Sequence, residues 1–447
     1  MRRSLILAVS LIAAAPALAD DWPQWMGPNR DGIWRETGVL EKFPKNGPQQ
    51  LWTAEIGGGY AGPAVADGKV YVLDRVLAKD VKNPSNPFDT TTPVHGVERV
   101  LCFDSKTGKE VWKHEYSVEY KVSYGAGPRC TPTVHEGKVY TLGSMGDLYC
   151  LDSSKGTVLW KKDFKTDYMA KTPVWGFCGH PLVYKNLLIC LVGGGKSLLV
   201  AFDKNTGKEV WKALSPASPG EAGYAPPTII EAGGVAQLVA FQPTAVTGLD
   251  PMTGAKFWSV PIAPDHKMSI MAPQKSGDLL FVAGAGKAAV TLKLDSAKPT
   301  VTEEWRGDGK TDGVYPVNMT PFIDNGTIYA VDQPGMLRAI DLATGKRLWY
   351  AFEPVIEQNQ IEAFKGAGSG TAFIVKNGDR FFLFNEKGSL IIAKLSPQGY
   401  TEIDKAKLLE PTSSAFGRKV VWTYPAFADK CIYVRNDKEL ICFSLAK

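Results

Sequence analysis

The sequence lacks the cysteine and histidine patterns that hold metals and haem. None of its seven cysteines is adjacent to another, and no C-x-x-C-H haem attachment motif occurs. No spacing typical of metal ligands relates the five histidines, which are His95, His114, His135, His180 and His266. A serine in a G-x-S-x-G elbow is also missing. These absences exclude a histidine-based zinc site, a built-in haem relay and the common serine hydrolases, and we predict no metal site.

Clustered basic residues are missing as well. The formal charge is only +5, from 51 Lys and Arg against 46 Asp and Glu, and the basic residues are dispersed. Because nucleic-acid binding normally requires a basic patch, nucleic acid is not an expected partner. With 44% hydrophobic and 22% charged residues, the composition is typical of a soluble folded chain. No segment shows sustained helical periodicity.

The only long apolar run lies at the N-terminus. Arg2 and Arg3 precede an apolar stretch over residues 5–15, and Ala17-Leu18-Ala19 supplies a small-residue cleavage site. This pattern predicts a signal peptide over residues 1–19. We therefore expect an exported chain, periplasmic or extracellular, that is soluble and has no membrane span after cleavage. No cysteine stands at the cleavage point, so a lipoprotein anchor is not expected.

The odd cysteine count leaves at least one free thiol in the monomer. Cys102, Cys150 and Cys442 occupy matching places in a repeat, where a small buried apolar residue suffices. Cys130 and Cys178 precede neighbouring repeats, and we state their pairing in a disulfide as a hypothesis.

A repeated segment organises the chain. An aspartate stands eight residues before a tryptophan in each of five copies, and a sixth, degenerate copy has two extra residues. The copies are CFDSKTGKEVW ending at Trp112, CLDSSKGTVLW at Trp160, AFDKNTGKEVW at Trp211, GLDPMTGAKFW at Trp258, KLDSAKPTVTEEW at Trp305 and AIDLATGKRLW at Trp349. The tryptophans are 44 to 51 residues apart, a period typical of propeller blades.

Each unit contains four short apolar runs bounded by Gly, Asp or Asn, which indicates four antiparallel strands. The D-x-x-T-G element suits a tight turn, and the tryptophan suits the wedge between neighbouring sheets. We therefore assign a structural, blade-docking role to Trp52, Asp104, Trp112, Asp152, Trp160, Asp203, Trp211, Asp250, Trp258, Trp305, Asp341 and Trp349.

Eight units start along the chain, seven with a proline and one without it at residues 370–384. The last unit supplies only three strands, whereas residues 51–56 form an orphan strand near the N-terminus. The sequence therefore predicts an all-β, eight-bladed β-propeller of four-stranded antiparallel blades over residues 51–447, closed by strand 51–56 in the C-terminal blade. We expect residues 20–50 to form an extension that packs on the ring.

The A-x-D-x-x-T-G-x-x-x-W units resemble the pyrroloquinoline-quinone (PQQ)-like repeat propellers. That superfamily includes quinoprotein alcohol dehydrogenases and the outer membrane assembly factor BamB family. The resemblance covers nearly the whole chain beyond residue 19, and it implies the eight-bladed fold while leaving function open.

The cofactor is a separate question from the fold. Quinoprotein alcohol dehydrogenases generally carry an adjacent Cys-Cys disulfide, a Ca²⁺ site and a catalytic aspartate, and the cysteine pair is missing here. A branch of quinoproteins without that pair keeps PQQ with Ca²⁺ open as the alternative cofactor. We assign no catalytic residue and no cofactor.

One face of the ring is the expected binding mouth, because the loops that connect blades converge there. The longest interruption of the repeat, over residues 74–99, is expected to be a loop on that face. Aromatic and polar residues near the starts of the inner strands join it. The candidate ligand residues are Tyr60, Asp74, Arg75, Glu98, Tyr124, Arg129, Trp175, His180, Tyr224, Met271 and Asn318.

These observations favour a non-catalytic binding or assembly module of the cell envelope. We expect a monomer whose partner is an envelope protein or a small ligand at the mouth. One alternative is a PQQ-dependent quinoprotein oxidoreductase acting on an alcohol or a sugar, with the cofactor in the mouth. A second alternative is a glycan-binding propeller that uses the mouth aromatics.

Overall fold

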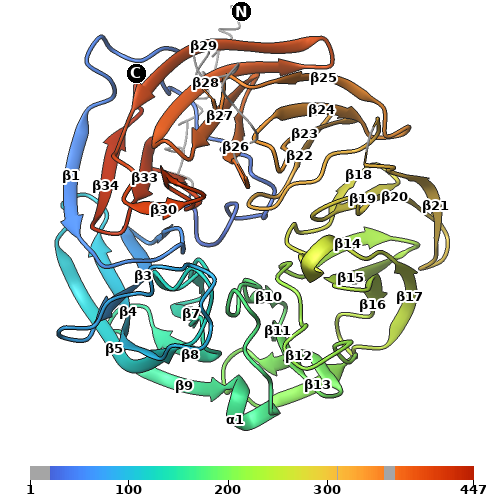
Figure 1. Cartoon of the computed structure of the whole chain (residues 1–447), viewed down its shortest axis with the longest axis horizontal. Coiled ribbons are helices and arrows are strands. Elements are labelled where there is room, and N and C mark those ends of the chain that lie inside the picture. The colour runs from blue at the N-terminus through green and yellow to red at the C-terminus, as the bar shows by residue number, and fades with distance from the viewer. Residues whose placement is uncertain (1–20, 310, 357–367) are drawn as a thin grey trace, which may run out of the picture.

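The computed structural model describes residues 21–309, 311–356 and 368–447. Eight four-stranded antiparallel sheets stand around a central axis as the blades of a β-propeller, which confirms the predicted fold class (Figure 1). The predicted signal peptide, residues 1–19, lies outside the described residues. Within the described residues, no helix has the length and apolar character needed to span a membrane.

Each blade begins with its innermost strand and ends with its outermost strand. The strands are β2 Ala64–Ala66, β3 Lys69–Leu77, β4 Val94–Asp104 and β5 Glu110–Tyr120 in blade 1; β6 Thr133–His135, β7 Lys138–Leu142, β8 Asp147–Asp152 and β9 Val158–Asp163 in blade 2; β10 Leu182–Tyr184, β11 Leu187–Gly194, β12 Ser197–Asp203 and β13 Glu209–Ala213 in blade 3; β14 Thr228–Ala232, β15 Val235–Gln242, β16 Ala245–Leu249 and β17 Lys256–Pro261 in blade 4; β18 Gln274–Ser276, β19 Leu279–Ala283, β20 Ala289–Leu294 and β21 Val301–Arg306 in blade 5; β22 Phe322–Asp324, β23 Thr327–Val331, β24 Leu337–Asp341 and β25 Arg347–Ala351 in blade 6; β26 Ala372–Asn377, β27 Arg380–Asn385, β28 Ser389–Ser396 and β29 Gly399–Lys407 in blade 7; and β32 Ala426–Ala428, β33 Cys431–Arg435, β34 Glu439–Ser444 and β1 Gln50–Glu55 in blade 8.

Burial along the strands follows their position in the blade. The third strand of blade 3, β12, reads SLLVAFD and is buried at all but its last residue, because neighbouring blades cover both of its faces. The outer strand β13 reads EVWKA and buries only its tryptophan, since its other side chains face solvent or the blade edge. The core is therefore a ring of interfaces between blades.

The D-x-x-T-G turns are held by their aspartates. In blade 1 the Asp104 carboxylate accepts hydrogen bonds from the Thr107 backbone N–H at 2.8 Å and the Thr107 hydroxyl at 2.7 Å. These bonds, led by the Thr107 hydroxyl, lower the pKa of Asp104. The following Gly108 has a φ of +69°, which L residues rarely adopt.

Each such glycine also receives the tryptophan of the preceding blade. The Trp112 indole donates to the Ser153 carbonyl at 3.0 Å, and a Cβ at Gly156 would lie only 2.4 Å from its ring. Five joints share this arrangement, with Cβ-to-ring distances of 2.4 to 2.7 Å: Trp52 on Gly108, Trp112 on Gly156, Trp160 on Gly207, Trp211 on Gly254 and Trp305 on Gly345. The joint after Trp258 differs, because the degenerate sixth copy lacks that glycine, and this indole donates to Gln237 instead.

The two chain ends close the ring together. Strand β1 pairs antiparallel with β34 as the outer strand of blade 8, one residue earlier at each end than the predicted 51–56. On the mouth side Arg435, at the end of β33, is fully buried and donates to the carbonyls of Gly57 and Leu73 of blade 1, both at 2.6 Å. A buried cation therefore reinforces the seam between blade 1 and blade 8, the blade whose strands β34 and β1 are joined by pairing and not by a chain connection.

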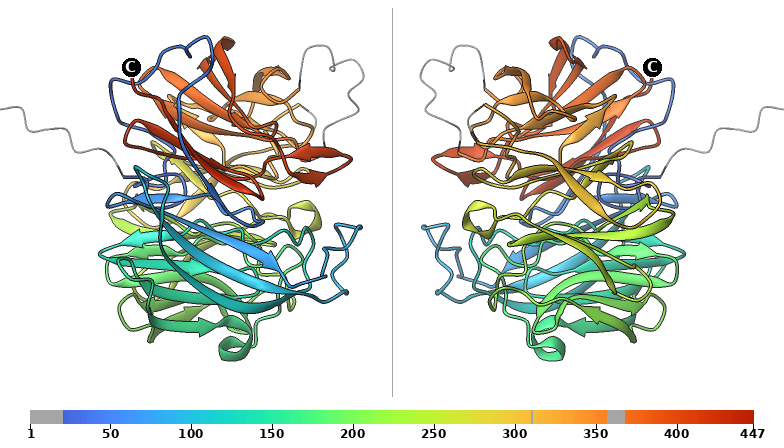
Figure 2. Two further views of the ribbon diagram at one scale, coloured as in Figure 1. Left: turned by 90° about the vertical axis from the view of Figure 1, so that its left-hand side faces the viewer. Right: turned by 90° about the vertical axis from the view of Figure 1, so that its right-hand side faces the viewer.

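The described part of the N-terminal extension lines the face opposite the mouth (Figure 2). Trp22 forms a backbone bridge with Val65 of blade 1, and the Trp34 N–H donates to Lys376 O of blade 7 at 2.8 Å. Between them, Arg30 donates to the Pro181 carbonyl of blade 3. The segment therefore crosses the central axis and closes the channel from that side.

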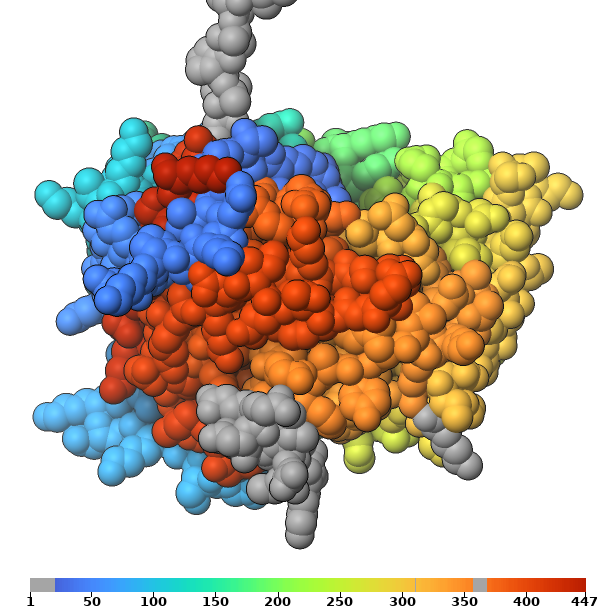
Figure 3. Space-filling model, turned by 90° about the horizontal axis from the view of Figure 1, so that it is seen from above, coloured from blue at the N-terminus to red at the C-terminus, as the bar shows by residue number. Residues whose placement is uncertain are grey.

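The rest of the extension runs along blades 7 and 8 toward β1. The Leu40 N–H donates to Leu445 O at 2.8 Å, and the Phe43 N–H donates to the Asp404 carboxylate at 2.7 Å. Figure 3 shows this part in blue against the C-terminal blades in red and orange. Residues 21–47 thus belong to the propeller body.

Three insertions rise on the mouth face. They are the loop 78–93 of blade 1, the hairpin β30 Ser413–Ala415 with β31 Arg418–Val420, and the 3-10 helix η1 Asp265–Lys267 (Figure 2). The short helix α1 Phe164–Tyr168 follows blade 2. Of these elements, only the loop 78–93 was expected from the sequence, as part of the interruption over residues 74–99.

All seven cysteines are free thiols in the structure, so the Cys130–Cys178 disulfide hypothesis is wrong for it. The Cys130 thiol is directed to the Phe177 carbonyl at 3.7 Å, and the Cys178 thiol to the Trp175 carbonyl at 3.4 Å. The packing role predicted for Cys102, Cys150 and Cys442 agrees with their full burial.

Candidate functional site

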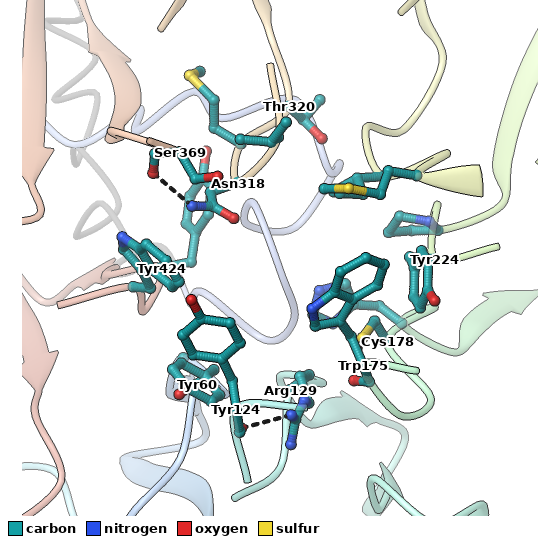
Figure 4. Close-up of a pocket in the computed structure, with 18 of the residues that line it drawn as sticks. Tyr60, Tyr124, Arg129, Trp175, Cys178, Tyr224, Asn318, Thr320, Ser369 and Tyr424 are labelled. Atoms are coloured by element: carbon teal, nitrogen blue, oxygen red, sulfur yellow. Dashed lines mark hydrogen bonds between the residues drawn. The ribbon is translucent and has the colours of Figure 1, made fainter. Parts of the chain in front are cut away.

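A cavity of about 770 Å³ opens at the mouth of the ring. Ten of its described lining residues are Phe, Tyr or Trp: Trp25, Tyr60, Phe88, Tyr124, Trp175, Tyr224, Phe373, Phe416, Trp422 and Tyr424. Figure 4 places Tyr60, Tyr124 and Tyr424 on one side and Trp175 and Tyr224 across from them. This size and composition are typical of small-ligand sites.

Most of the sequence candidates lie around this cavity. Seven line it: Tyr60, Tyr124, Arg129, Trp175, His180, Tyr224 and Asn318. They come from the segments that lead into the inner strands of blades 1 to 4 and 6, and convergence of these segments on the axis brings them together. Their role in ligand binding remains a prediction.

Met271 does not reach the cavity. It is fully buried, and its sulfur accepts a hydrogen bond from the Ala283 N–H at 3.0 Å. The expectation that it faces the mouth is wrong, because the polarizable thioether fills the joint at the start of blade 5 instead.

Asp74 and Arg75 also lie away from the cavity, because both ends of the expected loop 74–99 are strand. Strand β3 runs to Leu77 and β4 begins at Val94, so that Asp74 pairs with Arg99 in the ladder and the loop spans only 78–93. The Asp74 carboxylate is fully buried and binds the Arg99 guanidinium with two charge-assisted bonds, at 2.8 and 2.5 Å. It is a structural ion pair.

Glu98 is buried between blades 1 and 2, so its placement at the mouth is likewise wrong. Its carboxylate accepts hydrogen bonds from the hydroxyls of Tyr116 and Tyr120 and from the Ser144 N–H. Arg75 stacks 3.8 Å above the Tyr120 ring and donates to the Val94 carbonyl at 2.6 Å. Arg75 and Glu98 are opposite each other in the β3–β4 ladder, and each side chain binds neutral partners.

The floor of the cavity comes from the N-terminal extension. The Trp25 ring stacks on the His180 ring, with centroids 4.9 Å apart and planes at 12°. The His180 Nδ1 accepts a hydrogen bond from the Thr131 N–H at 3.0 Å. Burial, aided by the charge of Arg30, lowers the pKa of His180 to about 3. The imidazole is therefore neutral and carries its proton on Nε2.

Arg129 is the only charged side chain of Asp, Glu, Lys or Arg among the described lining residues. It donates to the carbonyls of Ser123 and Tyr124, both at 2.8 Å, and to the Ser144 hydroxyl at 3.0 Å. Within the described ranges no carboxylate lies within 4 Å of it. The guanidinium thus holds the turn before blade 2 without a direct ion pair, and Ser144, whose hydroxyl accepts from Arg129, donates its N–H to the buried Glu98 carboxylate.

An aromatic rim surrounds the opening. Phe88 of loop 78–93 and Phe416 of the β30–β31 hairpin are each 51% exposed, and their rings lie 6.4 Å apart. Tyr124 and Trp422 join them, with ring centroids 5.8 Å apart. The sequence analysis missed Phe88, Phe416 and Trp422, because single aromatics inside irregular loops carry no periodic signal.

The cavity does not fit PQQ with Ca²⁺. Hard cations need several oxygen ligands, and among its described lining residues no Asp or Glu occurs. The described part of the chain also holds no group of three His, Cys, Asp or Glu side chains able to bind a metal. Cys178 is the one lining cysteine, so a vicinal disulfide against a quinone is absent from that wall.

Comparison with known proteins identifies relatives at the sequence level. The profile of the family described as outer membrane protein assembly factor BamB matches residues 96–272 and 244–447. The chain is 25% identical over 328 residues to outer membrane protein assembly factor BamB of Burkholderia pseudomallei (strain K96243), covering 70% of this chain and 71% of that protein. It is 34% identical over 101 residues to the protein of the same name from Xanthomonas campestris pv. campestris, covering 21% of this chain and 25% of that protein.

Solved structures share the fold at low identity. The crystal structure of BamB from Moraxella catarrhalis matches with a TM-score of 0.55 and 14% identity, over 89% of this chain and 97% of that one. Quinohemoprotein alcohol dehydrogenase from Comamonas testosteroni matches with a TM-score of 0.58 and 15% identity, over 95% of this chain and 80% of that one. These likenesses concern the propeller alone, whereas the family profile covers most of the sequence. The chain belongs to the family of outer membrane protein assembly factor BamB.

Proposed function

We propose that the protein is a non-catalytic assembly factor of the cell envelope that binds envelope polypeptides at its mouth. The observation that carries this proposal is the aromatic cavity of about 770 Å³, which continues into the exposed Phe88 and Phe416 of the rim. Aromatic side chains in such settings dominate the binding energy of protein contacts. Membership of the BamB family supports the same function.

The cellular location in this proposal follows from the N-terminal segment of the sequence. In this proposal residues 1–19 are a signal peptide that is removed on export, and no lipid anchor follows. The mature chain then works as a soluble monomer in the periplasm. Its partner meets the mouth face, because the N-terminal extension closes the opposite face.

The two alternatives have less support. A quinoprotein dehydrogenase is supported by the shared fold, but the described cavity wall offers one guanidinium and no carboxylate for a quinone and its Ca²⁺. A glycan-binding site needs several directional polar groups beside the aromatic side chains on which the sugar stacks. One such group, the Asn318 amide, is already engaged, because it donates to the Ser369 carbonyl at 2.8 Å.

A binding experiment tests the proposal. The mature chain is titrated with a fluorescently labelled outer-membrane protein diluted from urea, and the folded form of the same protein serves as the control ligand. We expect binding of the unfolded form only. Replacing both Phe88 and Phe416 by Ser should weaken binding at least about tenfold, because two exposed aromatic anchors are removed.

Tyr350 supplies the matched control. It is 65% exposed on the outer strand β25 of blade 6, and Tyr350→Ser should leave the affinity unchanged. Equal loss from the rim and control variants, or no binding of the unfolded protein, would refute a polypeptide-binding mouth.

A further inference from the structure

We infer that the cavity below the rim binds an aromatic or apolar group that carries a carboxylate. This inference deepens the proposed function, since it names the chemistry of the group that the same mouth would hold. The group has two sources, a free aromatic acid or the C-terminal residue of a polypeptide, and the experiment below separates them.

The first support is the sign of the charge. Arg129 is the one Asp, Glu, Lys or Arg of the described wall, and its hydrogen bonds go to neutral oxygens, those of Gly127, Ser123, Tyr124 and Ser144. Two other arginines near the mouth are paired, Arg99 with Asp74 and Arg418 with Glu386. Arg75 and Arg435 donate to backbone carbonyls, as Arg129 does, but they are not among the described lining residues of the cavity. Beside aromatic side chains, a guanidinium without a direct ion pair favours an anionic ligand over a neutral one.

The second support is an unused polar group. The Tyr124 hydroxyl is inaccessible to solvent and has no hydrogen-bond partner among the described residues. Figure 4 shows its ring within the cavity, and the Tyr124 carbonyl is bonded to the Arg129 guanidinium. Buried hydroxyls are normally satisfied, so this one, at the end of the ring that points away from Arg129, offers a further donor to a ligand in the cavity.

The third support is a second donor at the floor. Because the His180 Nδ1 accepts from the Thr131 N–H, the ring proton is on Nε2 and the imidazole presents a donor. The Trp25 ring stacked on it adds an apolar surface. Hydrogen-bond donors around an aromatic cavity fit a carboxylate attached to an apolar group. A cationic ligand would find no negatively charged acceptor among the described lining residues.

The closed floor decides how the ligand is held. The segment with Trp25 and Arg30 crosses the axis, and Arg30 bonds to inner-strand carbonyls of blades 3 and 4 at Pro181 and Pro227. A polypeptide cannot pass through the ring, so a chain end or a small molecule fits, and an internal segment in full extension does not. A cavity of about 770 Å³ suits such a group.

The experiment uses two matched pairs of probes on the intact mature protein. One pair is N-acetyl-phenylalanine and its amide, and the other is an acetylated pentapeptide ending in phenylalanine with a free or an amidated C-terminus. Affinity is measured by calorimetry. Occupancy of the cavity is measured by protection of Cys178 from alkylation, since Cys178 lines the cavity and the other six cysteines are buried.

We expect each carboxylate to bind at least about tenfold more tightly than its amide, and to protect Cys178. Binding of the small acid alone identifies a free acid as the ligand, and binding of the peptide alone identifies a chain end. Equal affinities for acid and amide, or absence of all binding, overturn the inference.

Variants locate the effect. Tyr124→Phe removes a hydroxyl that has no partner, so the fold is preserved, and it should weaken the acids several-fold more than the amides. Arg129→Met should abolish the preference for the acid, whereas Arg129→Lys should keep part of it, and Tyr350→Phe is the neutral control. Absence of an acid preference in the parent chain, with retained binding of the unfolded outer-membrane protein, refutes this inference alone. The reverse outcome refutes the proposed function alone.

Discussion

The joint between blades 1 and 2 allows a sharp test of how the ring is held together. Gly156 has a φ of +70°, and a Cβ there would meet the Trp112 ring at 2.4 Å. Gly137, in the same blade, has a φ of +71° and nothing within 4 Å of its Cβ position. Gly156→Ala and Gly137→Ala therefore impose the same backbone strain. Only Gly156→Ala also brings a Cβ into collision with the Trp112 ring.

The expected magnitudes follow from that difference. Alanine in the left-handed region costs about 1–2 kcal/mol, and this is the whole effect expected for Gly137→Ala. For Gly156→Ala the indole must shift by about 1 Å, which adds about 1–3 kcal/mol of overpacking. The shift also strains the 3.0 Å bond from the Trp112 indole to the Ser153 carbonyl, worth about 1 kcal/mol. Gly156→Ala should thus be less stable than Gly137→Ala by at least about 2 kcal/mol.

The assay is urea unfolding of both variants and the parent chain, followed by tryptophan fluorescence and circular dichroism. The comparison requires that the free energy of unfolding falls with urea concentration at the same slope in all three proteins. If both alanine variants lose the same stability, the indole does not press on Gly156, and the account of the blade joints is refuted.

Two further predictions concern buried charge. Arg435→Met should destabilise the protein by about 3 kcal/mol or more in urea unfolding, because the carbonyls of Gly57 and Leu73 lose their donor; an unchanged midpoint would show that the seam does not depend on this guanidinium. Burial, with a contribution from Glu98, raises the pKa of Asp147 to about 6. The folded state therefore holds this proton more tightly than the unfolded state, and stability falls as pH rises from about 4 to 6. Asp147→Asn should consequently gain about 1–3 kcal/mol on the parent chain at pH 7 and nothing at pH 3.5, whereas a gain independent of pH would contradict this reasoning.

The fold was predictable because the repeat is periodic. The tryptophan in each copy marks an outer strand, the D-x-x-T-G element marks a turn, and the orphan strand near Trp52 marks the closure. The Asp–Trp segment recurs in five copies and in a degenerate sixth. The length of the first hairpin was misjudged, because Asp74 and Glu98 look like loop residues and their burial depends on Arg99 and Tyr120. The Cys130–Cys178 disulfide was wrong as well.

The site was predictable only in part. Residues next to the inner strands, such as Tyr60 and Arg129, could be placed at the mouth once the topology was known. Trp25 could not, since its position depends on how the extension crosses the axis. Phe416 could not either, because the β30–β31 hairpin interrupts the repeat without a pattern of its own.

The sequence by itself determined the number of blades, their strand order and the way the ring closes. The spacing of the repeated tryptophans, the turn residues and the starts of the eight units can all be counted along the chain. Only the tertiary structure decided which polar groups are used up in the fold and which face the cavity. That division depends on partners far apart in the chain: Asp74 is neutralised by Arg99, whereas Arg129 meets only neutral oxygens and keeps its charge beside the cavity. Charge compensation is a property of three-dimensional contacts, so no reading along the chain supplies it.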